Sequence, residues 1–394
     1  MTKRRKEKTT RRKKMAHIDY LLLVLILALL AYGLLMLYSA TFYVGMRFWR
    51  QQLIWLTLGG IVMAVMAWLP YPLWQRLALP LMLVTLLLLL LVLLLGEQVL
   101  GAQRSLVGAS VQPGVLSRLA AVIYIAAWLA SKGEQLNQVR YGLIPFAVIT
   151  GIVASLVALQ PDLSTALLLV VAGLMMFFFA GGDPVQIFLS VVMGSTAFGL
   201  VAWRLPHARA RLLAYVESLQ DPTRMPYHVR RAIIAIGEGG LFGVGIGGSR
   251  LKAGYLPFPH TDSIFAVIGE ETGLVGTLLV VAFFALLAYR GYHIALSTPD
   301  AFGALLAFGI TTMVISEAMV NIMVMVGLIP FTGTALPFFS YGGSEMVVTM
   351  MAMGLLLGVS RGRSRREWDM ILDRWVGNWQ APTSRTNRRG VTSR

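Results

Sequence analysis

The stretch LMLVTLLLLLLVLLLG (residues 81–96) contains no charged side chain and no regular alternation of polar and apolar residues. Inside a bilayer the backbone has no water to bond with, so only helices and closed β-barrels can cross it. A barrel strand alternates polar and apolar side chains, and this stretch does not. The stretch therefore predicts a membrane-spanning helix.

The rest of the chain repeats this pattern. It has 394 residues, a mean hydropathy of +0.71 and 13% charged residues. Apolar runs of about 20 residues can each cross a bilayer as a helix. The predicted spans are residues 19–42, 52–69, 76–96, 113–131, 141–159, 163–180, 185–203, 263–289, 301–327 and 342–360. The fold class is therefore all-α: a polytopic integral membrane helical bundle of about ten transmembrane helices, with a large extracytoplasmic loop between spans seven and eight.

The net charge of +16 is concentrated at the two ends of the chain. Residues 1–14 hold nine Lys or Arg and one Glu, and residues 361–394 hold nine Arg and three acids. Basic segments beside membrane spans are typical of the cytoplasmic side and do not indicate nucleic-acid binding here. We predict a basic cytoplasmic tail (1–18), a membrane domain (19–360) and a second basic cytoplasmic tail (361–394), whose tryptophans favour an interfacial helix.

The predicted loop 204–262 carries eight Lys or Arg against four acidic residues. Either a long loop simply tolerates these cations, or they meet an anionic ligand, and phosphate is a natural partner of Arg. Its GVGIGG (243–248) matches a dinucleotide-binding fingerprint, but a βαβ unit cannot surround it between two membrane spans. These glycines instead favour a loop that folds tightly against the bundle or a ligand.

Four ionisable residues lie within or at the edge of the predicted spans: Arg118, Asp162, Glu317 and Glu345. A charge at this depth is costly unless it is paired, neutral or in a wet cavity, so these residues are functional candidates. Asp162 follows Pro161, which favours a helix cap, although a carboxylate there can also hold a divalent cation. A neutral, hydrogen-bonded carboxyl group is the alternative for Glu317 and Glu345, and Arg118 needs a partner.

The segment HTDSIFAVIGEETG (260–273) contains one histidine and three carboxylates. Eight residues separate Asp262 from Glu270, or about 12 Å of helix. The two carboxylates of a glycosidase lie within about 10 Å of each other, so these two are an unlikely pair. If Asp262 is catalytic, the reaction needs one protein base and a leaving group that departs without a proton. His260 would orient Asp262 or its loop, and Glu270 and Glu271 would be structural or cavity-lining.

Several motifs, in this order, resemble signature stretches of the SEDS family, the FtsW and RodA proteins of bacterial division and elongation. They are GAQRSL (101–106), QPDLSTALLL (160–169), IAIGEGGLFGVGIGGSR (234–250), LPFPHTDSIFAVIGEETGLVG (256–276) and VNIMVMVGLIPFTGTALPFFSYGGS (320–344). The resemblance covers roughly residues 19–360. It implies a peptidoglycan glycosyltransferase of the bacterial cytoplasmic membrane that polymerises lipid II, with undecaprenyl pyrophosphate as leaving group and a class B penicillin-binding protein as partner.

The resemblance places the family's catalytic aspartate at Asp262, as general base on the acceptor hydroxyl. Arginines of the outer loop and a divalent cation, Mg or Mn, would stabilise the pyrophosphate as its charge develops. The residues expected to bind substrate are Arg104, Arg118, Asp162, Arg230, Arg231, His260, Ser340 and Glu345.

One motif departs from the family pattern. Where the family has Q-P-S-E followed by a lysine, this chain reads QPGVLSR (112–118), with Val115 at the position of the glutamate and Arg118 at that of the lysine. Glu317 or Glu345 would then supply the missing negative charge. Two further functions stay open: a transporter that flips the lipid-linked precursor, and a non-catalytic scaffold for the penicillin-binding protein.

Overall fold

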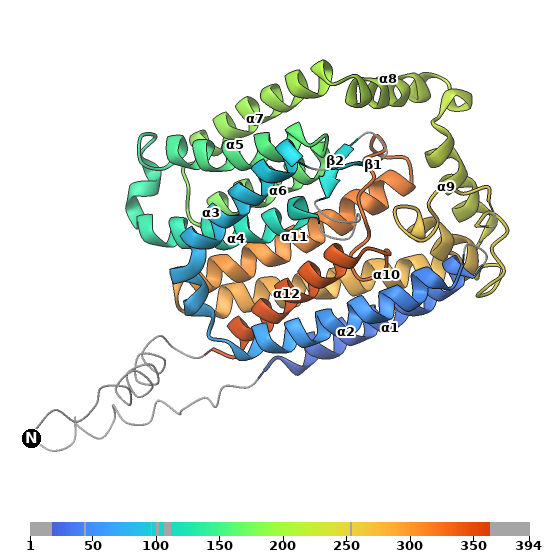
Figure 1. Ribbon diagram of the computed structural model, residues 1–394, viewed down its shortest axis with the longest axis horizontal. Helices are drawn as coiled ribbons and strands as arrows, with labels where there is room; N and C mark the ends of the chain where they lie inside the picture. Colours follow the sequence, from blue (N-terminus) through green and yellow to red (C-terminus); the bar gives the residue numbers. More distant parts are fainter. Residues whose placement is uncertain are drawn as a thin grey trace, which may run out of the picture.

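The computed structural model of the chain is a bundle of long helices (Figure 1). The structure describes residues 18–42, 45–95, 97–99, 102–105, 112–252 and 254–362. The greater part of both predicted tails, with the interfacial helix expected in the second, lies outside the described residues.

All ten predicted spans are present as helices. Eight are at least 18 residues long and apolar enough to cross a membrane, and α5 and α6 are apolar helices of 17 residues. The spans are α1 (Tyr20–Thr41), α2 (Arg47–Trp68), α3 (Tyr71–Leu95), α4 (Pro113–Lys132), α5 (Leu143–Leu159), α6 (Leu163–Phe179), α7 (Pro184–Arg204), α10 (Ile264–Ser297), α11 (Ala301–Met325) and α12 (Gly343–Ser360). The predicted membrane-spanning helical bundle is confirmed.

The bundle has two distinct ends. α1 begins where α12 ends: the N–H of Asp19 donates to Ser360 Oγ (3.3 Å), and Arg290 of α10 pairs with the Asp19 carboxylate. We call this end the tail end, because both ends of the described chain lie there (Figure 1). The opposite end carries the turn with Asp262, and we call it the Asp262 end.

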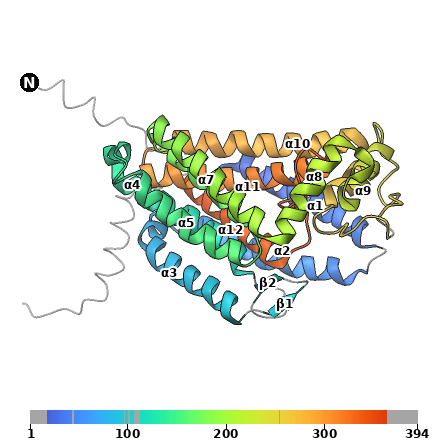
Figure 2. The same cartoon turned by 90° about the horizontal axis from the view of Figure 1, so that it is seen from above.

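Three helices form the centre of the bundle. In α4, α11 and α12, 67% of the most apolar window is buried inside the protein, against 11% in α7. α7 therefore lies at the edge of the bundle, where Figure 2 shows it crossing the outside of α5. A peripheral helix with an apolar surface is expected to face lipid, because no other element covers it.

The connections at the Asp262 end include short elements. The long loop predicted between spans seven and eight is confirmed and contains α8 (Pro206–Gln220), the 3₁₀ turn η2 (Pro222–Arg224) and α9 (Tyr227–Glu238). A hairpin of β1 (Glu97–Val99) and β2 (Ala102–Ser105) follows α3 (Figure 2). Its strands have three and four residues, too few for an alternating pattern to reveal them, and the sequence did not predict them.

Several helices extend beyond the apolar run that predicted them. α2 begins at Arg47, α3 begins at Tyr71, and α10 continues through Arg290 to Ser297. Hydropathy marks the part of a helix that lies in hydrocarbon, whereas backbone hydrogen bonding continues into the polar interface. α3 also contains Pro80, which is tolerated in membrane helices because neighbouring groups satisfy the freed carbonyl.

α10 is broken at Gly273, where the backbone takes the non-helical angles φ 66° and ψ −161°. In an unbroken helix the N–H groups of Leu274 and Val275 would donate to the carbonyls of Glu270 and Glu271. The break separates these groups, so two donors and two acceptors need other partners.

Residues 239–248, which we call the glycine loop, supply those partners. The two freed carbonyls accept hydrogen bonds from the N–H groups of Val244 (3.0 Å) and Gly245 (3.1 Å). The two freed N–H groups donate to the carbonyls of Gly240 (2.9 Å) and Leu241 (3.2 Å). The prediction that these glycines fold a loop tightly against the bundle is confirmed.

A pair of glycine substitutions tests this contact. Gly243 has φ +79°, and a Cβ there would lie 2.1 Å from the Glu271 carbonyl oxygen. Gly240 has φ +54°, but a Cβ there would meet nothing within 4 Å. Gly240→Ala should cost about 1–2 kcal/mol for its left-handed backbone, and Gly243→Ala about 1–3 kcal/mol more for the overlap. Thermal unfolding in detergent, followed by tryptophan fluorescence, measures both; equal losses would contradict the close approach.

Candidate active site

Asp262 lies in the turn that leads into α10. The turn is closed by Ser263, whose Oγ donates to the Pro257 carbonyl (2.9 Å). The Asp262 side chain is partly exposed. Its carboxylate lies against Gly333 in the connection between α11 and α12, because a Cβ on that glycine would be 3.4 Å from Asp262 Oδ2. The carboxylate is therefore accessible but has a fixed protein surface on one side.

Asn321, in the last third of α11, fixes the backbone of this turn. Its Nδ2 donates to the carbonyl oxygens of Asp262 (2.9 Å) and Thr334 (2.6 Å), and the residue is 1% exposed. One buried amide thus joins the turn to the α11–α12 connection. Sequence reasoning missed this residue; the signal available was an amide among apolar residues in a predicted span, which usually marks a hydrogen-bonded contact.

Two further bonds join the same segments. Ser340 Oγ donates to the Thr261 carbonyl (2.7 Å) and accepts from the Leu336 N–H (2.7 Å). The N–H of Tyr341 donates to the His260 carbonyl (2.7 Å). Ser340 is buried, so its place in the structure favours holding the turn over the substrate contact expected from the sequence.

His260 packs its ring against α2. The imidazole stacks on Phe48 with 4.6 Å between ring centroids, and burial lowers the pKa of His260 below its usual value. A neutral ring held between its neighbours suits the orienting role expected for His260.

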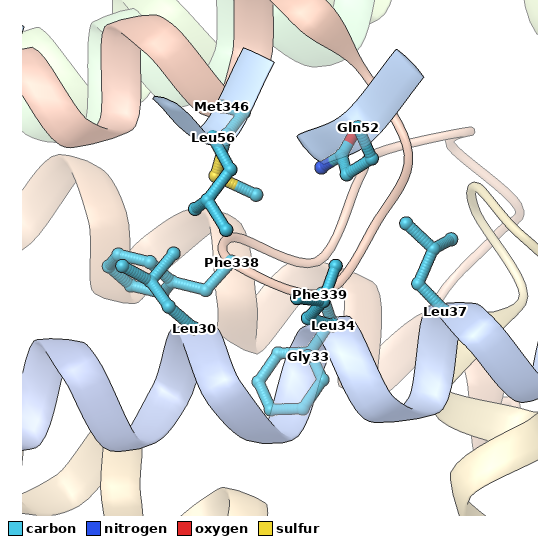
Figure 3. A pocket seen from close by; sticks show the side chains of 9 residues that line it. All are labelled: Leu30, Gly33, Leu34, Leu37, Gln52, Leu56, Phe338, Phe339 and Met346. Atoms are coloured by element: carbon cyan, nitrogen blue, oxygen red, sulfur yellow. The ribbon is translucent and has the colours of Figure 1, made fainter. Parts of the chain in front are cut away.

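The α11–α12 connection is itself anchored on α1. Phe338 and Phe339 point toward α1, and a Cβ on Gly33 would lie 2.2 Å from the Phe338 carbonyl oxygen, so the backbone approaches closely (Figure 3). The cavity between these residues, α2 and α12 has room for about 10 Å³. That space is at the lower limit for one water, so this is a packing gap and not a ligand site.

Arg118 of α4 lies in a buried cluster with two carboxyl groups. Its Nη1 is 2.7 Å from Glu317 of α11, and its Nη2 pairs with Glu345 of α12. The expectation that Arg118 is paired is confirmed.

Two carboxyl groups approach Arg118 close to Val115. Val115, which the resemblance places at the position of the family's glutamate, is buried in α4 one turn before Arg118. Glu317 of α11 and Glu345 of α12 contact the same guanidinium. That they supply the charge of the absent glutamate stays a prediction.

Asp162 is the N-cap of α6, as predicted. Its carboxylate accepts from the Thr165 N–H (3.2 Å) and from Thr165 Oγ1 (2.9 Å). A Cβ on Gly114 of α4 would lie 3.9 Å from Asp162 Oδ2, and Ser164 Oγ donates to the Thr332 carbonyl (2.8 Å). The first turns of α4 and α6 therefore meet beside the segment that holds the Asp262 carboxylate.

Arg211 of α8 reaches this segment from the long loop. Its Nη1 is 3.5 Å from the Thr332 carbonyl oxygen, and its guanidinium lies over the Phe331 ring, 5.4 Å from the centroid. His228 of α9 also stacks on Phe331, with 5.0 Å between the ring centroids. Arg211 was one of eight cations in the loop, and sequence alone could not distinguish it from the others.

The other arginines named from the sequence are placed differently. Arg231 of α9 packs on Tyr227 and Tyr255, with its Cζ 5.2 Å and 5.7 Å from the ring centroids. Arg230 is exposed on α9. Arg104 lies in β2, but its side chain is outside the described residues. None of these contacts tests a role in substrate binding.

Glu270 and Glu271 hold the segment that follows the glycine loop. Glu270 accepts from Ser249 Oγ (2.5 Å) and from the Arg250 N–H (2.7 Å). Glu271 forms an ion pair with Lys252 (2.5 Å), and both side chains are 0% exposed. The structural alternative given for these two glutamates is confirmed.

The expected divalent cation has no ready protein cage. Among the described residues, no group of three or more His, Cys, Asp or Glu side chains could hold a metal ion. Magnesium is commonly held by one or two carboxylates together with substrate phosphates. Asp262 and Asp162 would suit that arrangement.

Substitutions in the Arg118 cluster should have unequal effects. Arg118→Leu leaves the buried Glu317 and the partly buried Glu345 without their cation, and should cost about 3–5 kcal/mol of stability. Replacing all three ionisable side chains, with Arg118→Leu, Glu317→Gln and Glu345→Gln together, should recover most of the loss. The thermal unfolding midpoint measures this; a triple variant no more stable than Arg118→Leu would contradict an electrostatic origin.

Acidification should destabilise the Asp262 end. Burial lowers the pKa of His260, and burial together with the repulsion of Arg211 lowers that of His228. The unfolded chain then binds more protons, so stability is complete above pH about 6.5 and falls as the pH drops below it. His260→Phe keeps the stacking surface but does not titrate, so the unfolding midpoint should fall less between pH 7 and pH 5. An unchanged pH dependence would exclude His260 as a source.

Known proteins are similar to this chain over most of its length. The chain is 36% identical over 363 residues to the "Probable peptidoglycan glycosyltransferase FtsW" of Trichlorobacter lovleyi, a match that covers 89% of this chain and 94% of the relative. It is 36% identical to the "Stage V sporulation protein E" of Bacillus subtilis, over 87% of this chain and 97% of the relative.

Solved structures are also similar. A chain of a peptidoglycan synthase complex aligns with a TM-score of 0.73 and 29% identity, over 88% of this chain and 99% of that one. The Thermus thermophilus rod shape determining protein RodA aligns with a TM-score of 0.66 and 28% identity, over 87% of this chain and 97% of that one. The family model for FtsW, RodA and SpoVE, described as "Cell cycle protein", matches residues 20–365. The chain belongs to this family.

Proposed function

We propose that this protein is a peptidoglycan glycosyltransferase that polymerises lipid II. The observation that carries the proposal is the position of Asp262: a partly exposed carboxylate on a turn whose backbone is fixed by Asn321, in a chain whose relatives include probable peptidoglycan glycosyltransferases. A carboxylate that is partly exposed and lies on a turn held in place can act as a general base toward a substrate hydroxyl.

The reaction needs few protein groups. Asp262 accepts the proton of the 4-hydroxyl of the acceptor GlcNAc as its oxygen attacks the MurNAc carbon of a second lipid II molecule. The bond from that carbon to the undecaprenyl pyrophosphate breaks, and the electron pair leaves with the pyrophosphate. Because this leaving group is a stable anion, it needs no proton from a second acid.

The surroundings of Asp262 suit an anionic leaving group. α4, α6, α10 and α12 all begin at the Asp262 end, and a helix N-terminus carries a partial positive charge that favours phosphate. Contacts between these first turns hold them together: the Gln112 N–H donates to Ser344 Oγ (3.1 Å), joining α4 to α12. Arg211 adds a full positive charge beside Thr332. Where a divalent cation takes part, Asp262 or Asp162 and the pyrophosphate would hold it and it would neutralise phosphate charge.

The proposal includes a location and a partner. The Asp262 end would face the outside of the bacterial cytoplasmic membrane and both tails the cytoplasm, supported by the positive charge of the tails. A class B penicillin-binding protein is the proposed partner, supported by the similarity to a chain of a peptidoglycan synthase complex.

Asp262→Asn tests the base. The purified protein with its cognate penicillin-binding protein and labelled lipid II should lose about 10²–10⁴-fold in the rate of glycan formation, because the amide cannot accept the proton. Asp221→Asn, at a loop carboxylate whose contacts are with Thr223 and Arg224 of the same turn, is the matched control and should keep the parental rate. Gel analysis of the glycan strands gives the rate.

The same preparations distinguish the alternatives. Undiminished glycan chains from Asp262→Asn, with partner binding intact, would refute the assignment of Asp262. Movement of lipid II across liposomes that is unaffected by Asp262→Asn, without polymerisation by the parent, would favour a transporter. Partner binding with neither activity would favour a scaffold.

A further inference from the structure

The glycine loop exposes a row of large apolar side chains. The exposed fractions are 62% for Leu241, 80% for Phe242, 50% for Val244 and 58% for Ile246. Residues 239–248 contain no charged side chain. Four neighbouring apolar side chains are costly to leave in water, so this surface calls for an apolar partner.

The loop cannot turn these side chains inward. Its backbone is tied to the break in α10 by four hydrogen bonds of 2.9–3.2 Å. A Cβ on Gly239 would lie 1.9 Å from the Gly269 carbonyl oxygen, so the loop is already in close contact with α10. The apolar tip is thus held level with Gly273 along the axis of the bundle, and the depth of Gly273 in the membrane sets the depth of the tip.

Two distances along the helices, each counted from the tail end, give the depth of Gly273. Gly273 is 17 residues from Arg290, which pairs with Asp19 at the tail end, and 17 residues of helix rise about 26 Å. Tyr32 of α1 lies 3.3 Å from Thr272, and 12 residues of helix from Tyr20 rise about 18 Å. The hydrocarbon core is about 30 Å thick. Both measures place Gly273 between the middle of the membrane and its edge at the Asp262 end.

The tip is also continuous with a lipid-facing surface. Leu274 and Val275, whose N–H groups bond to the loop, are 49% and 54% exposed, and Leu278 in the next turn of α10 is 56% exposed. The nearest charged residues in the sequence, Glu238 and Arg250, lie on either side of the loop. A charge-free segment between charged neighbours is what a short excursion into hydrocarbon requires.

We propose that the glycine loop is inserted into the bilayer, with Leu241, Phe242, Val244 and Ile246 among the acyl chains of the leaflet at the Asp262 end. The segment lies within a loop that hydropathy places wholly outside the membrane. The partner is the acyl chains of that leaflet, because apolar side chains can contact any of them, and no particular headgroup is required.

Insertion would fix the height of the catalytic turn. Eleven residues, at most about 16 Å of helix, separate Gly273 from Asp262. With the loop among the acyl chains, Asp262 reaches the headgroup layer. The buried ion pair of Lys252 with Glu271 joins the segment that follows the loop to α10.

The chain contains no cysteine, so single-cysteine variants can be spin-labelled without background. Phe242→Cys is the test position, with Ile246→Cys as a second should the first not fold. Leu278→Cys, exposed on α10, is the lipid control, and Thr223→Cys, exposed on η2, is the water control. Each protein is purified without any partner and placed in vesicles of phosphatidylethanolamine and phosphatidylglycerol. For each spin label, the collision rate with oxygen, which concentrates among acyl chains, is compared with the collision rate with a water-soluble nickel chelate.

Labels at positions 242 and 246 should collide several-fold more with oxygen than with nickel, as at position 278, while position 223 shows the reverse. Variants are compared only where gel filtration and the unfolding midpoint match the parent. Nickel accessibility at 242 and 246 equal to that at 223 would overturn the insertion. Protection that appears only after a penicillin-binding protein is added would also overturn it and assign the surface to that partner.

Discussion

Water does not reach the hydrocarbon core of a bilayer, so a polar group that this chain carries to that depth must find its partner inside the protein. The Arg118 guanidinium has two carboxyl groups from two other helices. Lys252 and Glu271 are fully buried against each other, with Ser39 of α1 donating to the carboxylate (2.7 Å). The helix break at Gly273 follows the same rule with backbone groups in place of side chains. Each solution joins segments that are distant in the sequence, and together they set the relative positions of the helices at the Asp262 end.

The sequence predicted the helices of the bundle because hydrophobic length is a local property. All ten spans could be located from runs of apolar residues, and Asp162 could be recognised as a cap from its place after Pro161. Features that depend on distant segments could not be found this way. The break at Gly273 lies inside a predicted span, and the glycine loop, some 30 residues earlier, supplies the hydrogen-bond partners that make it tolerable.

The candidate site was predictable in its chemistry and less so in its geometry. Asp262 was identified by its motif, and the cost of burying a charge required a partner for Arg118. Glu317 and Glu345 were named as sources of the missing charge, but their meeting on one guanidinium depends on how α4, α11 and α12 pack. Asn321 stood out in the sequence only as an amide within an apolar span, and Arg211 was one of eight loop cations, so the role of each became clear only from what it contacts.

The contacts around Asp262 also bear on how many protein acids the reaction can use. The oxygens of Glu270 accept from Ser249 Oγ and the Arg250 N–H, and Glu271 pairs with Lys252, so neither is available to a sugar. Glu317 and Glu345 are committed to Arg118, and Asp162 caps α6. The neighbouring carboxyl groups therefore have structural partners, while Asp262 lies on the turn whose backbone Asn321 holds. A site with a single base selects substrates whose leaving group is already a stable anion, and the helix N-termini gathered at this end favour one that carries phosphate. The polar contacts that position the helices are thus consistent with the proposed transfer from a phosphate-activated donor.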